Sequence, residues 1–341
     1  MSGSAGGGFA LMSEPLGLAE MTETPIVYIE AMRAGPSTGM PTKTEQGDLE
    51  HVLYSSQGDS CRVVFAPGNV REAYDQTRLA FELAYDYQIP ALIVYDQKHE
   101  GEMRSVPTSF FDREPDPSLG STLTEEEISE AAHHESGKFE RFRHDPEDGV
   151  SPRSVPGQKG GRFLATGNEH SEVGHINEDP DNRKAQFDRR MRKLDSIRQK
   201  LDDRDTSNQT YHGPEEAAVG LVTGGSQQDT VLEAVDVLQE NGLSVKAVGV
   251  SDLMPFPEAE MTEFLESVDE AIVVEMNASG QLRGLIQREL GRFGPKLSSL
   301  LKYDGEPFEP GEIVDEVTAS IEGEGDQRPA HNVKYVPAAG D

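Results

Sequence analysis

One arginine opens a loop that is rich in glycine, proline, serine and threonine. An apolar run over residues 26–29, with β-branched members, is typical of a buried strand of a parallel sheet. Arg33 follows this run, and open α/β sheets bind ligands just beyond the carboxyl ends of their strands. A guanidinium group can bind two oxygens of a carboxylate or a phosphate at once. The loop is therefore either an anion-binding site or a plain connection whose arginine pairs with a nearby acid.

A second candidate site lies at the N-terminus of the sequence. Ser2, Gly3 and Gly6 belong to a glycine-rich run that precedes apolar residues spaced like one face of a helix. The free backbone amides of a glycine-rich turn before a helix can hold a phosphate group. The alternative is a flexible N-terminal segment with no ligand.

The Arg33 loop resembles the signature of the α subunit of 2-oxoacid:ferredoxin oxidoreductases, and its 2-oxoglutarate branch in particular. The pattern in that family is R-x-GPSTG-x-PT followed by E-Q-x-DL, and residues 33–42 and 45–49 reproduce it. The resemblance implies that Arg33 binds the substrate carboxylate. It also implies that the turn with Ser2, Gly3 and Gly6 contacts the cofactor in a thiamine diphosphate pyrimidine-binding domain. The residues expected to line the substrate site beside Arg33 are Gly35, Pro36, Ser37, Thr38 and Gly39.

The sequence departs from the family pattern in two respects. The family's glutamate that hydrogen-bonds the aminopyrimidine of the cofactor precedes the glycine-rich turn, and neither Glu23 nor Glu30 matches its motif. The resemblance thus suggests a fragment, a misplaced start, or a member completed by an upstream chain. The G-D-G…N type motif that holds Mg²⁺ and diphosphate is also missing, so a β subunit is expected to supply that site. The same partner is expected to carry the iron–sulfur cluster, because Cys61 is the single cysteine.

Alternating strand and helix patterns at both ends of the chain predict a two-part α/β fold. In the first part, strands are expected at 26–29, 63–66 and 91–95, with Asn69 as the cap of a helix over 69–87 and Asp96 more as a helix cap than as a ligand. In the second part, one of the expected helices covers residues 278–293. The resemblance divides it into a partial thiamine diphosphate pyrimidine-binding-like domain over residues 1–96 and a transketolase C-terminal-like doubly wound domain over residues 213–322. Between them, residues 97–212 are polar and predict an excursion with helices at 124–133 and 183–203. Residues 323–341 are expected to form a disordered tail.

Two further motifs are expected to hold the structure together rather than to bind substrate. Gln46 and Asp48 belong to the E-Q-x-DL segment that follows the Arg33 loop. A second segment ends a predicted strand and caps a predicted helix, and it resembles the V-V-E-x-N-x-x-GQ motif of the same family. Its matching residues are Glu275, Asn277, Gly280 and Gln281.

The composition is strongly acidic. The 341 residues include 62 Asp and Glu against 31 Lys and Arg, which gives a formal net charge of −31. This charge argues against nucleic-acid binding, which needs a basic footprint. It favours a folded protein that works where salt screens repulsion, in a salt-adapted cytoplasm. The sequence shows neither an apolar run long enough to span a membrane nor the pattern of a signal peptide, which also suggests a cytoplasmic location.

A metal site is not expected within this chain. Most of the nine histidines lie in the polar middle segment, but none of their pairs has the tight spacing of a helix-borne metal site. The histidines that suggest such a site are His133, His134, His170 and His175.

The resemblance implies an α subunit that takes part in oxidative decarboxylation of a 2-oxoacid, most plausibly 2-oxoglutarate. It implies thiamine diphosphate as cofactor, CoA as co-substrate and ferredoxin as electron acceptor, with activity only in the presence of the β subunit. The alternatives are a truncated, non-catalytic paralogue with an assembly or regulatory role, and a small-molecule-binding α/β protein without electron chemistry. The Arg33 loop favours the enzyme, because an assembly factor has no evident need for that arginine.

Overall fold

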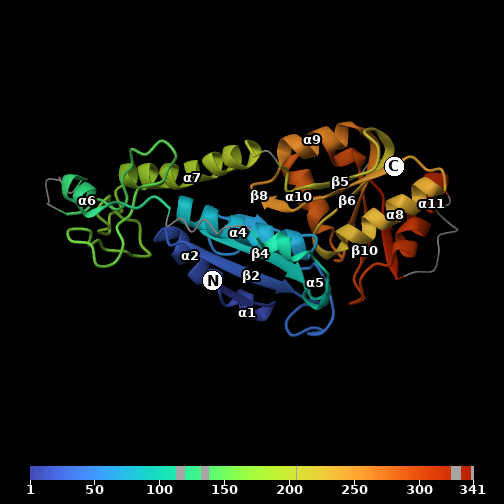
Figure 1. Cartoon of the computed structure of the whole chain (residues 1–341), viewed down its shortest axis with the longest axis horizontal. Helices are drawn as coiled ribbons and strands as arrows, with labels where there is room; N and C mark the ends of the chain where they lie inside the picture. The colour runs from blue at the N-terminus through green and yellow to red at the C-terminus, as the bar shows by residue number, and fades with distance from the viewer. Residues whose placement is uncertain (113–119, 132–137, 205, 324–331, 339–341) are drawn as a thin grey trace.

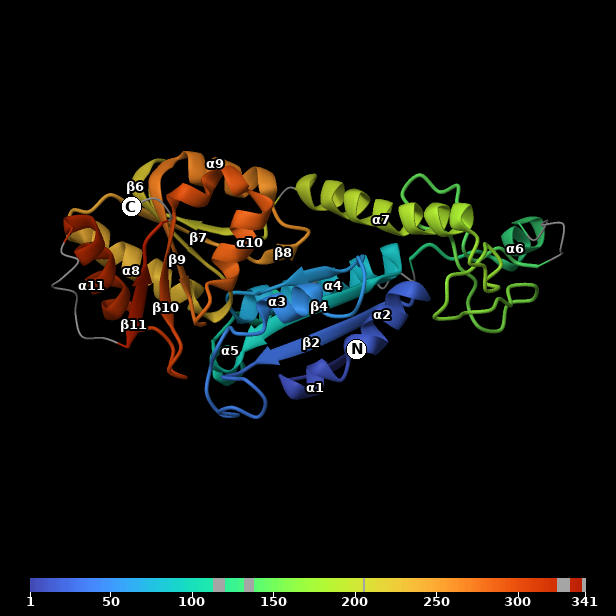
Figure 2. The same cartoon turned by 180° about the vertical axis from the view of Figure 1, so that it is seen from behind.

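Two β-sheets carry the chain, and Figures 1 and 2 show them from opposite sides. A computed structural model describes residues 1–112, 120–131, 138–204, 206–323 and 332–338. The first sheet lies near the N-terminus, the second lies at the far end beside the C-terminus, and a helical excursion extends away from both (Figure 1). None of the helices in the described ranges is both long and apolar enough to cross a membrane.

The first sheet has five strands in the order β1-β2-β4-β3-β8. At its centre β2 (Ile26–Met32) runs parallel to β4 (Pro90–Asp96), with Ile26 opposite Pro90 and Met32 opposite Asp96. On their flanks lie β1 (Ser2–Ser4) and β3 (Val63–Phe65). The predicted strands at 26–29, 63–66 and 91–95 are therefore confirmed, and β1 was not predicted.

Five helices belong to this first unit. They are α1 (Gly7–Ala10), α2 (Ser13–Met21), α3 (Leu49–Tyr54), α4 (Val70–Tyr87) and the short α5 (Gln97–Gly101). Asn69 caps α4 by accepting hydrogen bonds from the amides of Arg71 and Glu72, as its position in the sequence predicts. The Glu72 carboxylate accepts a hydrogen bond from the amide of Gly68. In a standard capping box the donor would be the amide of Asn69, one residue later.

The second sheet has six strands in the order β11-β10-β9-β6-β7-β5. The four inner strands are parallel: β6 (Ala217–Thr223), β7 (Val245–Gly249), β9 (Val268–Glu275) and β10 (Leu297–Lys302). The edges β5 (Thr210–His212) and β11 (Val333–Val336) are antiparallel to their neighbours. Its helices are α8 (Gln228–Glu240), α9 (Glu258–Glu266), α10 (Gln281–Glu289) and α11 (Pro310–Glu322), with short 3₁₀ helices η2 (Gly225–Gln227) and η3 (Gly291–Lys296).

Two sequence-based boundaries need correction here. The expected disordered tail, residues 323–341, contains β11, whose Leu300–Tyr335 pairing adds it to the edge of the second sheet. The other described residues of that tail form no helix or strand, and residues 324–331 and 339–341 lie outside the described ranges. The helix expected over 278–293 is shorter, because α10 runs only from Gln281 to Glu289 and is followed by the separate 3₁₀ helix η3, which contains Pro295.

The two units share both a strand and a core. The short strand β8 (Asp252–Met254) comes from the second half of the chain, but it pairs antiparallel with β3 at the edge of the first sheet. One buried apolar cluster runs from Leu16 and Val94 in the first unit to Val222 and Val273 in the second. A boundary at residue 213 therefore does not separate the two sheets into independent cores.

The excursion is anchored by a buried charge cluster. Its short α6 (Glu125–Ala131) lies at the far end of the molecule, and its long α7 (Pro180–Asp202) runs back towards the sheets (Figure 2). Arg189 and Lys193 of α7 both form ion pairs with the carboxylate of Glu23, and all three side chains are buried. Burial alone raises the pKa of Glu23, but the charges of Arg189 and Lys193 outweigh it and hold that pKa well below its usual range.

A network of buried hydrogen bonds joins the two sheets where β2 and β4 end. The Gln46 side chain donates to the carbonyl oxygen of Gly224 (2.9 Å) and accepts from the amide of Met276 (3.1 Å). Gln46 also lies beside Asp96, whose carboxylate accepts from the hydroxyls of Thr44 (3.0 Å) and Ser226 (2.7 Å). We call these six residues the inter-sheet network.

We expect Gln46→Ala to lower the free energy of unfolding by about 2 kcal/mol or more, because it leaves the buried amide of Met276 and the half-buried carbonyl of Gly224 without this partner. Urea unfolding followed by circular dichroism measures the change. Gln199→Ala, at an exposed position of α7, is the control and should shift stability by less than about 0.5 kcal/mol. Equal effects of the two substitutions would show that the network contributes little.

Glu23→Ala should be more damaging, with a loss of about 3–5 kcal/mol, because it leaves two buried cations uncompensated. The control is Glu306→Ala, which breaks an exposed ion pair with Lys43 and should cost about 1 kcal/mol or less. The same unfolding measurement serves both variants. A Glu23→Ala protein as stable as the control would mean that water or rearrangement satisfies Arg189 and Lys193.

Candidate functional site

The Arg33 loop projects from the carboxyl end of β2, where the sequence placed it. Ala34 and Met40 close its base through a hydrogen bond of 2.8 Å from the Met40 amide to the Ala34 carbonyl oxygen. Gly39 is required at this closure, since its φ is +50° and an added β-carbon would lie 1.9 Å from the Ala34 carbonyl oxygen. The tip of the loop, formed by Gly35, Pro36, Ser37, Thr38 and Gly39, is exposed to solvent.

The glycine-rich turn and the Arg33 loop lie against one another. Gly6 adopts a positive φ of +46°, and a β-carbon on it would lie 3.8 Å from Arg33 Nε and 3.9 Å from the Ser37 carbonyl oxygen. Two segments that the sequence proposed separately, one for cofactor and one for substrate, are thus brought together. Ser2 and Gly3 differ from the expected turn, because they form the edge strand β1 and pair with Tyr28 and Ile29.

Three carboxyl groups lie at the Arg33 loop, and two of them, Glu30 and Asp48, are close enough for the charge of Arg33 to act on them. Glu30 lies on β2 and is fully buried, and one of its oxygens accepts a hydrogen bond of 2.7 Å from the Gly6 amide. Glu45 accepts a hydrogen bond of 3.0 Å from the Gly35 amide, and Asp48 stands at the start of α3. Burial raises the pKa of each carboxyl, and for Glu30 it does so to about 8. The charge of Arg33 opposes this rise in the pKa of Glu30 and of Asp48.

The second predicted motif caps α10 and fastens it to the first unit. Glu275 is buried, and its carboxylate accepts from the amides of Leu282 (2.8 Å) and Arg283 (3.2 Å), while Asn277 accepts from the amide of Gly280 (2.8 Å). The Gln281 side chain donates to the carbonyl oxygen of Gly47 (2.7 Å). Asn277 likewise donates to the carbonyl oxygen of Gln46 (3.2 Å). Glu275, Asn277, Gly280 and Gln281 therefore form structural contacts near the site and do not line the Arg33 loop.

Sequence reasoning missed the part that Glu30 plays in this site. The residue was noted only as an acid near the loop, because an acid on a strand gives no sign of which face it occupies or what it contacts. The one available signal was its position inside an apolar run, at which a charged residue is rarely left without a partner. Asp96, expected as a helix cap, does cap α5 through the His99 amide, and it also joins the inter-sheet network.

The histidines do not form a metal centre in the described ranges. No group of three His, Cys, Asp or Glu side chains gathers there as metal ligands do. His170 is buried, with Nδ1 3.0 Å from the carbonyl oxygen of Asn168, and burial lowers its pKa. His175 contacts Lys138 instead. His133 and His134 lie outside the described residues.

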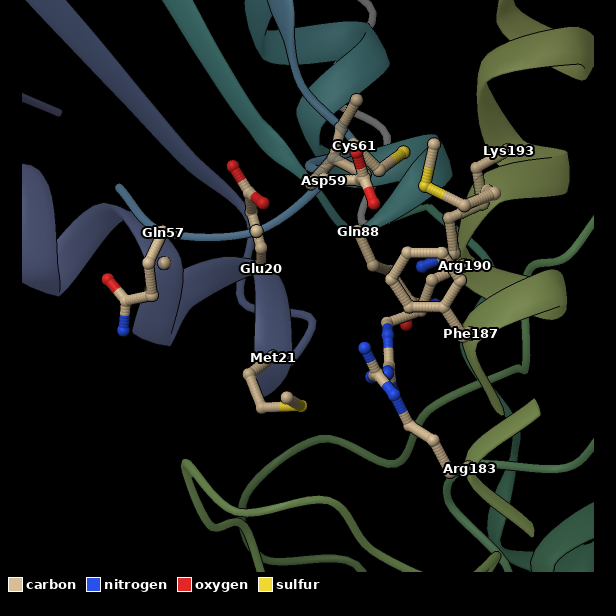
Figure 3. A pocket seen from close by; sticks show the side chains of 14 residues that line it. Glu20, Met21, Gln57, Asp59, Cys61, Gln88, Arg183, Phe187, Arg190 and Lys193 are labelled. Atoms are coloured by element: carbon tan, nitrogen blue, oxygen red, sulfur yellow. The ribbon is translucent and has the colours of Figure 1, made fainter. Parts of the chain in front are cut away.

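A separate cavity of about 120 Å³ lies between α2 and α7 and is shown in Figure 3. Glu20 and Gln57 line one side of it, and Arg183, Phe187 and Arg190 project from α7 on the other. Most of its charged side chains already have partners within the chain. Glu20 contacts Arg62 at 2.8 Å, Arg190 contacts Glu169 at 2.7 Å, and Lys193 pairs with Glu23.

Cys61 also lines this cavity and has the character of a buried structural thiol. Burial raises its pKa to about 12, so the reactive thiolate form is scarce at neutral pH. The cavity contains none of the residues that the sequence proposed for substrate or cofactor. We therefore interpret it as a packing feature between α2 and α7, and the Arg33 loop remains the candidate site.

The chemistry available around Arg33 is recognition of an anion. Arg33 is half-buried, and the Nε of its guanidinium is buried without a hydrogen-bond partner among the described residues. Such a group can bind a carboxylate through two parallel hydrogen bonds. The same loop also carries the exposed hydroxyl residues Ser37 and Thr38, which are further donors.

Comparison with known proteins agrees with this geometry. Residues 1–189 match the family described as "Pyruvate flavodoxin/ferredoxin oxidoreductase, thiamine diP-bdg", and residues 217–313 match "Pyruvate:ferredoxin oxidoreductase core domain II". The 2-oxoglutarate:ferredoxin oxidoreductase from Magnetococcus marinus, solved with 2-oxoglutarate, coenzyme A and succinyl-CoA bound, superposes with a TM-score of 0.79. It is 33% identical over 94% of this chain and 52% of that chain.

Two curated relatives have similar identity but different lengths. The 2-oxoacid:ferredoxin oxidoreductase 2 subunit alpha of Aeropyrum pernix is 34% identical over 94% of this chain and 47% of its own length. The 2-oxoglutarate synthase subunit KorA of Methanothermobacter thermautotrophicus is 31% identical over 92% of this chain and 78% of its own length. The chain thus spans about half the length of the first of these relatives.

The mixed α/β fold class predicted from the sequence is confirmed, with a thiamine diphosphate-binding family domain in the first half. The resemblance seen in the Arg33 loop therefore extends over most of the chain. This chain belongs to the family of 2-oxoacid:ferredoxin oxidoreductase α subunits.

Proposed function

We propose that this chain is part of a 2-oxoacid:ferredoxin oxidoreductase, in which it binds the 2-oxoacid through Arg33. The reaction is oxidative decarboxylation of the 2-oxoacid to an acyl-CoA, with the electrons passed to ferredoxin. The observation that carries the proposal is the meeting of Gly6, Arg33 and Ser37 at the carboxyl end of β2. A family signature, a half-buried arginine and a glycine-rich turn coincide there.

The division of labour with other chains follows from what surrounds Arg33. Bound thiamine diphosphate supplies the carbanion chemistry of decarboxylation. The turn around Gly6 offers a close backbone approach next to Arg33, which suits the pyrimidine side of that cofactor. In the described ranges no set of metal-ligating side chains accompanies it, and we assign the Mg²⁺ and diphosphate site to a β subunit. The iron–sulfur cluster belongs to that subunit too, because Cys61 is the single cysteine of this chain.

The substrate we favour is 2-oxoglutarate, and the acyl acceptor is CoA. Both are named with the solved relative from Magnetococcus marinus, and the KorA relative is named a 2-oxoglutarate synthase. In this chain Arg33 would hold the carboxylate next to the keto group, and Ser37 and Thr38 would contact the substrate from the loop tip. Pyruvate or broad 2-oxoacid use would leave the part played by Arg33 unchanged.

We also infer a salt-adapted, cytoplasmic setting from the net charge of −31. Dissolved salt weakens the repulsion between exposed carboxylates, and at low ionic strength the same repulsion opposes compact packing. A purified protein that stays folded and monodisperse without added salt would contradict the salt adaptation.

Arg33→Met should raise the KM for 2-oxoglutarate about a hundredfold in the assembled oxidoreductase, with little change in folding. The substitution removes two charge-assisted hydrogen bonds to the substrate carboxylate, a loss of about 3 kcal/mol. Arg33→Lys should recover only part of the loss, because an ammonium group lacks the two-donor fork. Steady-state reduction of ferredoxin, with CoA present, gives the KM of each variant.

Arg292→Met is the matched control, since Arg292 is exposed on η3 and pairs with Glu266. An unchanged KM in Arg33→Met would remove Arg33 from the substrate site. The non-catalytic alternative is tested by affinity capture from source cells at high salt. Co-elution with a cysteine-rich, thiamine-binding chain supports the enzyme, whereas a bait that elutes alone favours the assembly role.

A further inference from the structure

Glu30 stands out among the acids around Arg33 because one of its carboxyl oxygens has no partner. Its side chain is fully buried on β2, three residues before Arg33. Oε1 accepts the hydrogen bond from the Gly6 amide, while Oε2 is buried and unpartnered among the described residues. Leaving a buried carboxyl oxygen without a hydrogen bond is costly, so this arrangement calls for an explanation.

Arg33 has an unused hydrogen-bond donor that matches this unused group of Glu30. Its Nε is also buried without a hydrogen-bond partner in the described part of the chain. Gly6 connects the two residues, because its amide binds Glu30 and its α-carbon lies next to Arg33. A β-carbon added to Gly6 would be 3.8 Å from Arg33 Nε. Glu30 and Arg33 form no ion pair with each other in the structure, although they flank the same glycine. Each retains a hydrogen-bonding group that a ligand seated beside Gly6 can satisfy.

The surroundings of Glu30 favour a neutral carboxylic acid. Burial is the first cause that raises its pKa, to about 8, and the negative charge of Asp48 at the start of α3 raises it further. The Gly6 amide and Arg33 act in the opposite direction. The other titratable neighbour is Tyr95 on β4, which is neutral at pH 7. At neutral pH the carboxyl therefore carries a proton that it can donate.

We propose that Glu30, as a neutral acid, donates a hydrogen bond from Oε2 to the carboxylate of the 2-oxoacid that Arg33 binds. This inference rests on the proposed function and adds a second substrate-binding residue to it. The Gly6 amide holds the carboxyl through Oε1, and Oε2 remains without a partner among the described residues, so it can serve as the donor to this ligand. The substrate carboxylate then meets donors from both residues.

The proton on Glu30 is what makes this arrangement work. An ionised Glu30 would neutralise Arg33 and repel the substrate carboxylate, so the ionised acid and the bound substrate exclude one another. Binding of the 2-oxoacid is therefore linked to protonation of one group. Below the pKa of Glu30, substrate binding takes up no proton and does not depend on pH. Above that pKa, each bound substrate takes up one proton from solution.

A pH series on the assembled oxidoreductase tests the proposal. We expect the KM of the wild type for 2-oxoglutarate to be constant below about pH 7.5. Above about pH 8 it should rise about tenfold per pH unit, with kcat little changed. Glu30→Gln keeps a neutral donor and an acceptor for Gly6, so its KM should be within about threefold of wild type at pH 7 and flat to pH 9.5. Glu30→Ala should raise KM about tenfold or more already at pH 7.

Glu147→Gln removes an exposed acid far from the site and should keep the pH profile of the wild type. Calorimetry of 2-oxoglutarate binding to the wild-type complex, in two buffers of different ionisation heat at pH 9, gives a readout that needs neither turnover nor a variant. Uptake of about one proton per bound substrate supports the proposal, and no uptake overturns it.

The possible failures are distinguishable. A wild-type complex that turns over no 2-oxoacid and binds none overturns the proposed function, and this inference with it. An active complex whose Glu30→Gln variant keeps the alkaline rise in KM overturns the role of Glu30 alone. The same holds if Glu30→Ala binds substrate like the wild type at pH 7. If Glu30→Ala does not assemble, the calorimetric result on the wild type decides.

Discussion

The carboxylate of Asp96 is the point on which the site depends. It is fully buried at the end of β4, and a buried carboxylate must have its oxygens hydrogen-bonded. It meets this need with Thr44 from the end of the Arg33 loop, His99 from α5 and Ser226 from η2 of the second unit. Asp96 thereby holds three elements in place: the end of the Arg33 loop, the start of α5, and η2 of the second unit. The position of Arg33 follows from these constraints, because the loop that it opens is closed at Ala34 and held at Thr44.

The same requirement organises the far end of the molecule, where apolar residues are few. The excursion has too little hydrophobic surface to form a core of its own, and α7 instead buries Arg189 and Lys193 against Glu23. Arg141 adds a hydrogen bond to the carbonyl oxygen of Glu23, at the turn just before β2. Buried ion pairs of this kind determine how α7 is placed more than they stabilise the fold, because the cost of desolvation offsets much of the attraction. Their effect is to fix α7 in one register beside α2, with the paired charges of Figure 3 between them.

Much of the fold could be predicted from the sequence, because β4, β6, β7 and β9 are largely apolar and mostly buried over five to eight residues, and the short inner strand β3 is apolar and fully buried. The edge strands could not, since β1, β5 and β8 have three residues each and owe their existence to a neighbour. The pairing of β8 with the first sheet depends on tertiary contacts, and no local sequence pattern predicts it. In the site, the Arg33 loop was recognisable from its residues and Gly6 from its setting. The roles of Glu30, Thr44 and Ser226 were not, because they depend on contacts between strands, loops and units that sequence spacing does not encode.

The site also shows why a formal net charge says little about a single pocket. Counted at their ordinary pKa values, Glu30, Glu45 and Asp48 would place three negative charges at the loop that Arg33 opens and would repel an anionic substrate. Burial raises the pKa of all three, most clearly for Glu30, so the local charge is less negative than the sequence suggests. Dissolved salt screens the exposed carboxylates of the surface but reaches buried groups much less. An approaching anion therefore meets two different electric fields. At the surface it meets a repulsion that salt screens, and at the site it meets the Arg33 guanidinium among carboxyl groups whose pKa is raised. The second field is set by burial at the end of β2, and it can attract a carboxylate within a chain whose net charge is −31.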